Sequence, residues 1–267
     1  MSARAAVLGL VLWSGAVALG GAQSIAARVA ASRDGDVRLS YAARPGVVGN
    51  GRNMIQWNCR HGHCQSQVDG DWSDGDDWRN MCDSGPVRVA LRIRSGAVTD
   101  VRVAVGGQWI PRDNVTDLGT VSAPAAARYL VALAADADAG KVGGRAIFAA
   151  TLADSAVIWP ELLRMARSSG LPRETRHQAV FWVSQAAEDA ATSGLDSLVE
   201  TDSVDRDVRE QAVFALSQRP SDEGVPILIR IAKTHRDPAV RRRAIFWLGQ
   251  SDDPRALSLF EDLLTKP

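Results

Sequence analysis

A seven-residue pattern recurs about every 33 residues in the second half of the chain, and it constrains the fold more than any other feature. Each copy begins with alanine, a β-branched residue and phenylalanine. The copies stand at 146–152 (AIFAATL), 179–185 (AVFWVSQ), 212–218 (AVFALSQ) and 244–250 (AIFWLGQ). Their leading alanines are 33, 33 and 32 residues apart, and an arginine lies three positions before each of the last three. A phased period of this length indicates a repeat architecture.

Each copy is followed by a second apolar stretch with helical spacing. These stretches lie at 157–166, 195–199, 225–232 and 256–264. A single helical hairpin cannot bury both of its faces, whereas stacked hairpins share a continuous core. We therefore expect residues 123–267 to form a helical solenoid of four to five repeats, in which 123–135 belongs to a degenerate leading unit.

Two units carry the most recognisable residues, namely 205–209 (DRDVR) and 237–244 (DPAVRRRA) with its continuation Trp247-Leu248-Gly249. These residues resemble HEAT repeats, in the short HEAT-like form also seen in phycobilisome lyase subunits. The unit at 173–176 departs from the pattern because Arg173 stands where the aspartate belongs. The resemblance implies a short right-handed α-solenoid of HEAT-like helical hairpins. Such repeats mostly bind other proteins, and a minority assist enzymes or are enzymes.

The resemblance also implies structural roles for the recurring charged residues. In this repeat type, aspartate and arginine side chains of neighbouring units bond along the stack. The ladder candidates are Asp205, Arg209, Asp237, Arg241 and Arg176. The phenylalanines at the third repeat position have helical spacing and are expected in the core. They are Phe148, Phe181, Phe214 and Phe246.

Two tryptophans and a basic stretch are candidates for partner contact. Trp182 and Trp247 occupy a repeat position that is alanine in the other two units, so they either anchor a partner or fill gaps between repeats. Residues 230–243 hold six basic residues against one aspartate, which favours either a solvated rim or a patch for an acidic partner. The predicted partner-binding residues are Trp182, Trp247, Arg236, Arg242 and Arg243.

Residues 23–112 are expected to form a small N-terminal β-sheet domain, which makes the chain an α+β protein. Residues 87–93 and 101–105 alternate with period two around a Ser-Gly turn, which indicates a hairpin. The stretches 36–43 and 53–57 supply further strand candidates. Residues 23–35 are expected to be a loose N-terminal segment, and 113–122 a linker to the helices.

The first 22 residues have the layout of a secretory signal peptide. Arg4 precedes an apolar run from Ala5 to Leu19, and small residues follow up to Ala22. A membrane anchor is the alternative, but a span needs ~20 apolar residues and this run is shorter. We therefore expect an exported chain, periplasmic or extracellular, with no stable membrane span after cleavage.

The three cysteines and two of the four histidines lie close together in the sequence. They are Cys59, His61, His63, Cys64 and Cys82. In an oxidising compartment we expect one disulfide and one remaining thiol, with the pairing open. A zinc site or a redox-active module is the alternative, although this spacing matches no common zinc signature.

An acidic stretch follows at 69–77. Its carboxylates are hard ligands of the kind that calcium binds, although their spacing is not that of an EF-hand loop. The calcium candidates are Asp69, Asp71, Asp74, Asp76 and Asp77. A solvated acidic loop is the alternative, and this loop could also pack across the arginines that share one face of the hairpin. Those arginines are Arg88, Arg92, Arg94 and Arg102.

Charge and motif content narrow the function classes. Lysine plus arginine and aspartate plus glutamate each number 31, so no nucleic acid is expected as a partner. The chain carries no Gly-x-Ser-x-Gly, His-Glu-x-x-His or phosphate-binding Gly-Lys-Ser/Thr motif. We interpret it as an exported, non-catalytic scaffold that binds a protein partner without a cofactor. The alternatives are a HEAT-like lyase or enzyme-accessory subunit, and a metal-binding or redox module.

Overall fold

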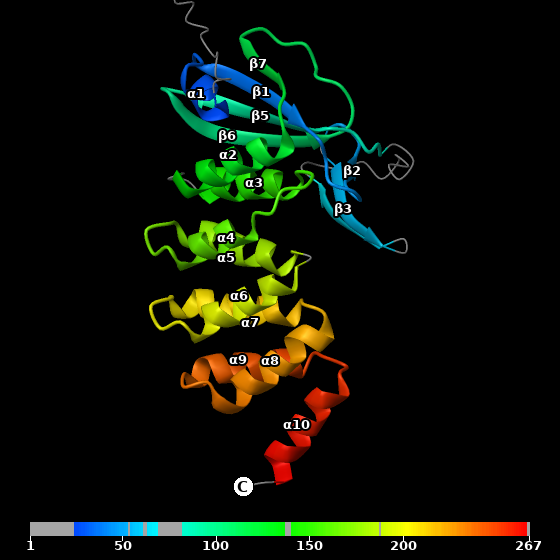
Figure 1. The fold of residues 1–267 in the computed structure, drawn as a ribbon, viewed down its shortest axis with the longest axis vertical. Coiled ribbons are helices and arrows are strands. Elements are labelled where there is room, and N and C mark those ends of the chain that lie inside the picture. The colour runs from blue at the N-terminus through cyan, green and yellow to red at the C-terminus, as the bar shows by residue number, and fades with distance from the viewer. Residues whose placement is uncertain are drawn as a thin grey trace, which may run out of the picture.

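The computed structural model describes residues 24–52, 54–60, 63–68, 82–136, 140–186 and 188–265. Strands lie at one end and a stack of helices extends from them (Figure 1). The strands are β1 (Gly35–Tyr41), β2 (Val48–Gly49), β3 (Met54–Arg60), β4 (His63–Val68), β5 (Val87–Arg94), β6 (Ala97–Val105) and β7 (Val115–Thr120). The helices are α1 (Ile25–Ala30), α2 (Ala123–Asp136), α3 (Gly140–Thr151), α4 (Trp159–Arg167), α5 (Arg173–Ser184), α6 (Asp189–Glu200), α7 (Arg206–Ser217), α8 (Ser221–Thr234), α9 (Pro238–Leu248) and α10 (Pro254–Thr265).

The larger sheet has the strand order β6-β5-β1-β7. The inward-facing side chains of its two central strands are buried, because one face of the sheet packs on helices. Arg38, Arg88 and Ala90 on the opposite face are buried as well. Val37, Leu39 and Tyr41 of β1 are fully buried on the inner face. The opposite, outer face carries charged residues such as Asp36 and Arg88. The period-two prediction for this hairpin is therefore confirmed.

Two expectations for the ends of the β domain are wrong. Residues 113–122 are not only a linker, because β7 lies within them and pairs in parallel with β1. The strand was missed because it is polar and only Leu118 of its residues is buried. The N-terminal segment is not loose throughout, because Ser24 caps α1, and Ile25 and Val29 of this helix are buried.

The smaller sheet has the order β2-β3-β4 and lies beside the first helices of the stack (Figure 1). Strand β3 pairs antiparallel with both of its neighbours. A bridge between Gly49 and Asp83 joins β2 to the segment that leads into β5. Trp57 of β3 is buried, and this side chain connects the small sheet to the helices.

The helices form successive antiparallel layers, α2/α3, α4/α5, α6/α7 and α8/α9, followed by α10 (Figure 1). Each layer pairs a helix of the repeated pattern with the apolar helix that precedes it. The pattern helices α3, α5, α7 and α9 also pack on one another in succession. The alanine that opens each copy is fully buried in this contact, because only a small side chain fits there: Ala146, Ala179, Ala212 and Ala244. The predicted solenoid is confirmed.

The larger sheet closes the N-terminal end of the stack. Its buried inner face continues into the helical core as one cluster of hydrophobic side chains. The Tyr41 hydroxyl donates a hydrogen bond of 2.7 Å to the carbonyl oxygen of Ala149 in α3. Arg145 of α3 reaches Asp100 of β6 at 2.7 Å. A solenoid needs a terminal element with a polar outer side, and here a sheet provides it.

Candidate functional site

The four phenylalanines at the third repeat position differ in exposure along the stack. Phe148 is 5% exposed, Phe181 and Phe214 are half-buried, and Phe246 is 51% exposed. The prediction that all four lie in the core is wrong for Phe246. Phe148 is covered by neighbouring side chains. Among the described residues, none covers Phe246 to the same extent.

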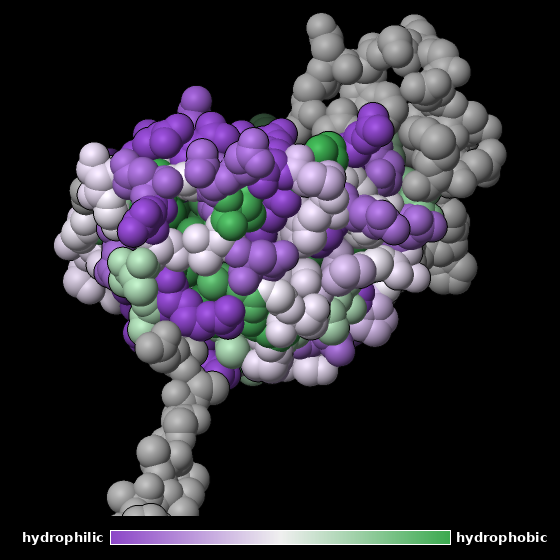
Figure 2. All heavy atoms as spheres, turned by 90° about the horizontal axis from the view of Figure 1, so that it is seen from above, coloured by the Kyte–Doolittle hydropathy of each residue, from purple (hydrophilic) through white to green (hydrophobic). Residues whose placement is uncertain are grey.

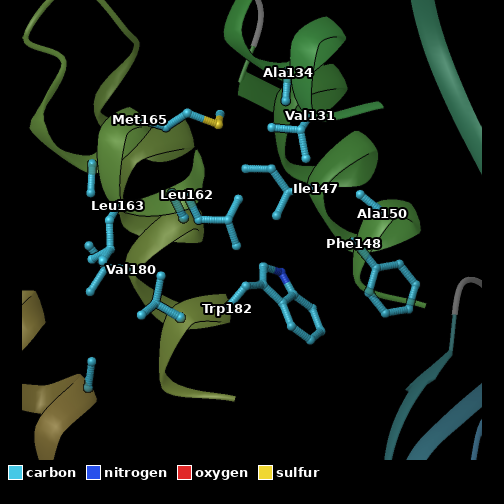
Figure 3. Close-up of a cluster of buried hydrophobic side chains, with 14 of the residues drawn as sticks. Val131, Ala134, Ile147, Phe148, Ala150, Leu162, Leu163, Met165, Val180 and Trp182 are labelled. Atoms are coloured by element: carbon cyan, nitrogen blue, oxygen red, sulfur yellow. The ribbon is translucent and has the colours of Figure 1, made fainter. Parts of the chain in front are cut away.

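Trp182 is a core residue and does not anchor a partner. It is 6% exposed, and its ring centroid lies 5.4 Å from that of Phe148 in the preceding pattern helix. Figure 3 shows the indole between α5 and α3, on the side of Phe148 and near Leu162. The prediction of a binding role is wrong here, because the indole fills the space between two successive pattern helices.

The phenylalanines and tryptophans of the pattern helices form an aromatic row along the stack. Strand β3 covers the first part of this row, at Phe148 and Trp182. The ring of Trp57 contacts Phe148 at 5.3 Å and Trp182 at 5.6 Å between centroids. The Trp57–Phe148 contact is edge-to-face, a favourable geometry for aromatic pairs. Sequence reasoning missed Trp57, because no local pattern links a strand residue to a repeat 91 positions later.

The last part of the row has no such cover in the described structure. Trp247 lies 4.8 Å from Phe214 and 5.0 Å from Phe246 between ring centroids. Trp247 is half-buried, whereas Phe246 is largely exposed. We call this surface the α9 patch. It comprises Phe214, Arg242, Arg243, Phe246 and Trp247.

Two arginines give the α9 patch its charge. The guanidinium of Arg243 lies over the Trp247 ring at 5.8 Å from its centroid. Arg242 is exposed and lies one helical turn before Phe246. Neither arginine forms an ion pair with a carboxylate among the described residues. The patch therefore combines an apolar centre with free positive charge.

Two other arginines of the predicted basic stretch are paired with carboxylates within the stack. Arg236 pairs with Asp202, and Arg230 pairs with Asp196 and with Glu200. Hydrogen bonding to Glu200 raises the pKa of Arg230 above its ordinary value, although burial opposes this. Arg236 therefore has a carboxylate partner in the described chain, although its side chain is 56% exposed, whereas Arg242 and Arg243 have none.

Two rungs of the predicted charge ladder are present. Arg176 of α5 contacts Asp205 at 2.5 Å, and Arg209 of α7 contacts Asp237 at 3.5 Å. Each rung joins a pattern helix to the aspartate at the N-terminus of the next one. Arg241 makes no third rung in the described chain, because its guanidinium donates to the carbonyl oxygens of His235 and Arg236.

Each of these two rungs is accompanied by a second ion pair, between the same two helices or to the aspartate that precedes the second helix. Arg173, which breaks the sequence pattern, reaches Asp207 at 2.5 Å, and Arg206 reaches Asp237 at 3.2 Å. Burial raises the pKa of Asp207, but its bonds to Arg173 and His177 outweigh this, so the pKa lies below its ordinary value. These charges hold the pattern helices in register.

The sequence candidates for disulfide and metal chemistry fall largely outside the described side chains. Asp69, Asp71, Asp74, Asp76 and Asp77 lie outside the described residues. Cys59 lies in β3 and Cys64 in β4, but their side chains are not described. The Cys82 thiol donates to the sulfur of Met54 at 3.6 Å. In the part of the chain that the structure describes, no disulfide and no metal-binding cluster is found.

The arginines on the outer face of the sheet are partly neutralised from within the sheet. Asp36 of β1 contacts Arg92 at 3.1 Å and Arg102 at 2.7 Å. Burial raises the pKa of Asp36, but these two arginines outweigh it and hold the pKa below its ordinary value. The acidic loop at 69–77, a candidate for packing across these arginines, lies outside the described residues. Asp36 pairs with two of the arginines, Arg92 and Arg102.

Comparison with known proteins agrees with the geometry of the stack. A family model of HEAT repeats matches residues 195–267. No curated protein matches the chain. No described helix has the length and apolarity that crossing a bilayer requires. The matched residues run from the second half of α6 through α10, and α3 and α5 continue the same repeat toward the sheet. The chain therefore contains HEAT repeats, and the stack they belong to is closed at its N-terminal end by a β domain.

Proposed function

We propose that this chain is an exported, non-catalytic scaffold that binds a protein partner through the α9 patch. HEAT repeats generally mediate protein interactions, which supports the choice of a protein partner. The observation that carries the proposal is the change of cover along one aromatic row. Trp57 packs on Phe148 and Trp182. The equivalent pair at the other end, Phe214 and Trp247, has no such ring packed on it among the described residues, and Phe246 beside it is 51% exposed.

The covered part of the row suggests how a partner would bind. Trp57 is a strand residue that inserts one aromatic ring against the pattern helices. A partner segment with an exposed aromatic or large apolar side chain would make the same kind of contact at Phe246 and Trp247. Aromatic and arginine side chains together are typical of interface residues that dominate binding energy.

The charge of the α9 patch favours acidic residues beside that apolar anchor. Arg242 and Arg243 have no carboxylate partner among the described residues, whereas Arg230 and Arg236 nearby are paired. Complementary charge mainly raises the association rate and selects among partners. An acidic, aromatic-bearing segment of an exported protein is the partner class we propose.

Export rests on the first 22 residues. A basic residue, an apolar run and small residues before Gln23 follow the order of a cleaved signal peptide. Expression of the full chain in an exporting host, with N-terminal sequencing of the mature protein, tests this. We expect the mature chain to begin at Gln23. Retention of residue 1 in a cytoplasmic product would contradict export.

The binding proposal is tested with the full chain as bait for exported proteins. A captured protein is purified, and its dissociation constant is measured for the wild type, for Phe246→Ala and for Arg242→Glu. We expect each substitution to weaken binding at least about tenfold, as central interface residues do. Leu264→Ala is the matched control, because Leu264 is an exposed apolar residue outside the patch.

Thermal unfolding of each variant checks that the stack is intact. Equal binding by the wild type and both patch variants would contradict a binding role of the α9 patch. Weakening by Leu264→Ala alone would move the interface to α10.

A further inference from the structure

The outer face of the larger sheet carries a small cavity. The chain runs from β6 at one edge to β7 at the other, and residues 108–112 of this connection lie over the face. The cavity beneath has a volume of about 150 Å³. Figure 2 looks onto this end of the molecule, where hydrophilic side chains gather around small hydrophobic areas. Five arginines line the cavity: Arg38, Arg52, Arg88, Arg102 and Arg112.

Two of these arginines are buried. Arg38 is 8% exposed and Arg88 is 4% exposed. Both guanidinium groups lie against the ring of Trp109, at 4.8 Å and 5.0 Å from its centroid. Arginine stacks well on aromatic faces, which fixes the planes of both groups. The two positive charges are thereby held close together in one position.

Neither buried arginine has a carboxylate partner among the described residues. Arg88 donates one hydrogen bond of 2.7 Å, to the carbonyl oxygen of Gly51, and the Nε atoms of Arg38 and Arg88 have no hydrogen-bond partner. Asp36 is the carboxylate that lines the cavity, and it already contacts Arg92, Arg102 and Arg112. A buried charge without a counterion is costly, and a guanidinium does not lose its proton to avoid the cost.

The electrostatics of Arg88 agree with this geometry. Burial lowers the pKa of Arg88, and the neighbouring charge of Arg38 lowers it further. The pKa of Asp36 lies below its ordinary value despite its burial, so that carboxylate is already ionised and used. The cavity lining holds five positive charges against one negative charge.

Two glycines fix the wall beside Arg88. Gly51 and Gly107 both have positive φ, +74° and +65°. A Cβ atom on Gly107 would lie 2.9 Å from the Gly51 Cα and 3.0 Å from a terminal nitrogen of Arg88. Only glycine allows this close approach of two backbones, so the connection is held against the sheet at the cavity.

We propose that this cavity binds a tetrahedral oxyanion, namely a phosphate or sulfate group. Guanidinium groups donate paired hydrogen bonds to such oxygens, and two stacked arginines present them in fixed planes. The cavity has room for a single anionic group or for the charged end of a larger molecule. This site lies on the sheet and is independent of the partner surface proposed for α9.

The proposal is tested by titration calorimetry on the full chain with inorganic phosphate and, in a second arm, with sulfate. Sodium chloride holds the ionic strength constant, so that general screening is the same in every sample. We expect saturable binding of at least one of the two anions. Arg38→Gln should raise the dissociation constant at least tenfold, and Arg112→Gln, at the exposed rim, should raise it less.

Arg94→Gln is the matched control, because Arg94 is an exposed arginine of β5 that does not line the cavity. It should bind like the wild type, and thermal unfolding shows whether each variant is folded. Absence of saturable binding in the wild type would overturn the proposal, as would equal weakening by Arg38→Gln and Arg94→Gln. The proposal would also be overturned for the natural chain if the wild type bound neither anion, while a variant with all five aspartates of 69–77 changed to asparagine did.

Discussion

Phe148 at the N-terminal end of the stack is 5% exposed, whereas Phe246, at the same repeat position near the other end, is 51% exposed. The N-terminal end packs against two sheets, and Trp57 closes the aromatic row there. At the other end α10 buries Ala256 and Leu259 but leaves three leucines exposed, Leu257, Leu263 and Leu264. One repeat pattern therefore gives a core residue at one end and a surface residue at the other.

This difference separates what a repeat specifies from what its neighbours specify. The repeat fixes where each phenylalanine points, because the pattern helices pack on one another in the same way along the stack. Whether that side chain is covered depends on the next element, which is outside the repeat. Substitutions at the two ends, at a rung of the charge ladder and at the contact with the sheet separate these contributions to stability.

Trp182→Ala should give the largest loss of stability. Removing a buried indole leaves a cavity between α3 and α5 and uncovers Trp57, at a cost of about 3–5 kcal/mol. Chemical denaturation measures the loss. Phe246→Ala is the comparison at the exposed end, where about 1 kcal/mol or less is expected. Equal losses for the two variants would show that the two ends do not differ in how much their aromatic side chains contribute to stability.

Asp205→Ala tests the rung that joins the two halves of the stack. It leaves the buried guanidinium of Arg176 without its carboxylate, at a cost of about 2 kcal/mol. The Asp205 side chain makes no capping hydrogen bond to α7, so the lost unfolding free energy measures the ion pair with Arg176. Asp252→Ala, in the exposed loop before α10, is the control and should change the unfolding free energy by less than about 0.5 kcal/mol. A loss no larger than the control's would mean that this rung is not stabilising.

Tyr41→Phe tests the contact between the sheet and the stack. The substitution keeps the buried ring but removes the bond from the hydroxyl to Ala149, so a loss of about 1–2 kcal/mol is expected. Burial raises the pKa of Tyr41 far above its ordinary value, so the hydroxyl stays protonated and the loss should not change with pH. Tyr129→Phe, at a half-buried tyrosine of α2, is the matched control. An unchanged denaturation midpoint for Tyr41→Phe would show that the bond does not hold the sheet on α3.

The pH dependence near α9 should be the smallest effect. A backbone bond from Ala239 lowers the pKa of Asp237, and although burial opposes this, Arg206 and Arg209 lower it further. A lowered folded-state pKa means that the contribution is present above the unfolded value of about 3.9 and is lost as the pH falls. Asp237→Asn should therefore reduce the fall of the denaturation midpoint between about pH 5 and pH 3. The same fall in both proteins would remove Asp237 as its cause.

Periodicity in the sequence predicted the solenoid and the central hairpin, because both follow from local spacing. It did not reveal β7, since an edge strand with polar residues on both sides leaves no alternation to read. It also placed Phe246 in the core, because the repeat position is equivalent to that of Phe148 while the cover over it is not.

The two candidate sites depended on contacts between distant residues. The sequence grouped Arg88 with its hairpin neighbours, but Arg38 and Trp109, which complete the cavity, lie 50 residues before and 21 residues after it. Trp247, Arg242 and Arg243 were found from repeat position and local charge. Local charge could not show that Arg236 pairs with Asp202, because Asp202 lies in the preceding layer.

The bond from Tyr41 to Ala149 has a consequence for how the β domain completes its core. These residues are 108 positions apart, and the inner face of the sheet is covered only once α2 and α3 exist. The β domain comes first in the chain, yet its inner face is buried against residues that follow it, so α2 and α3 complete its core.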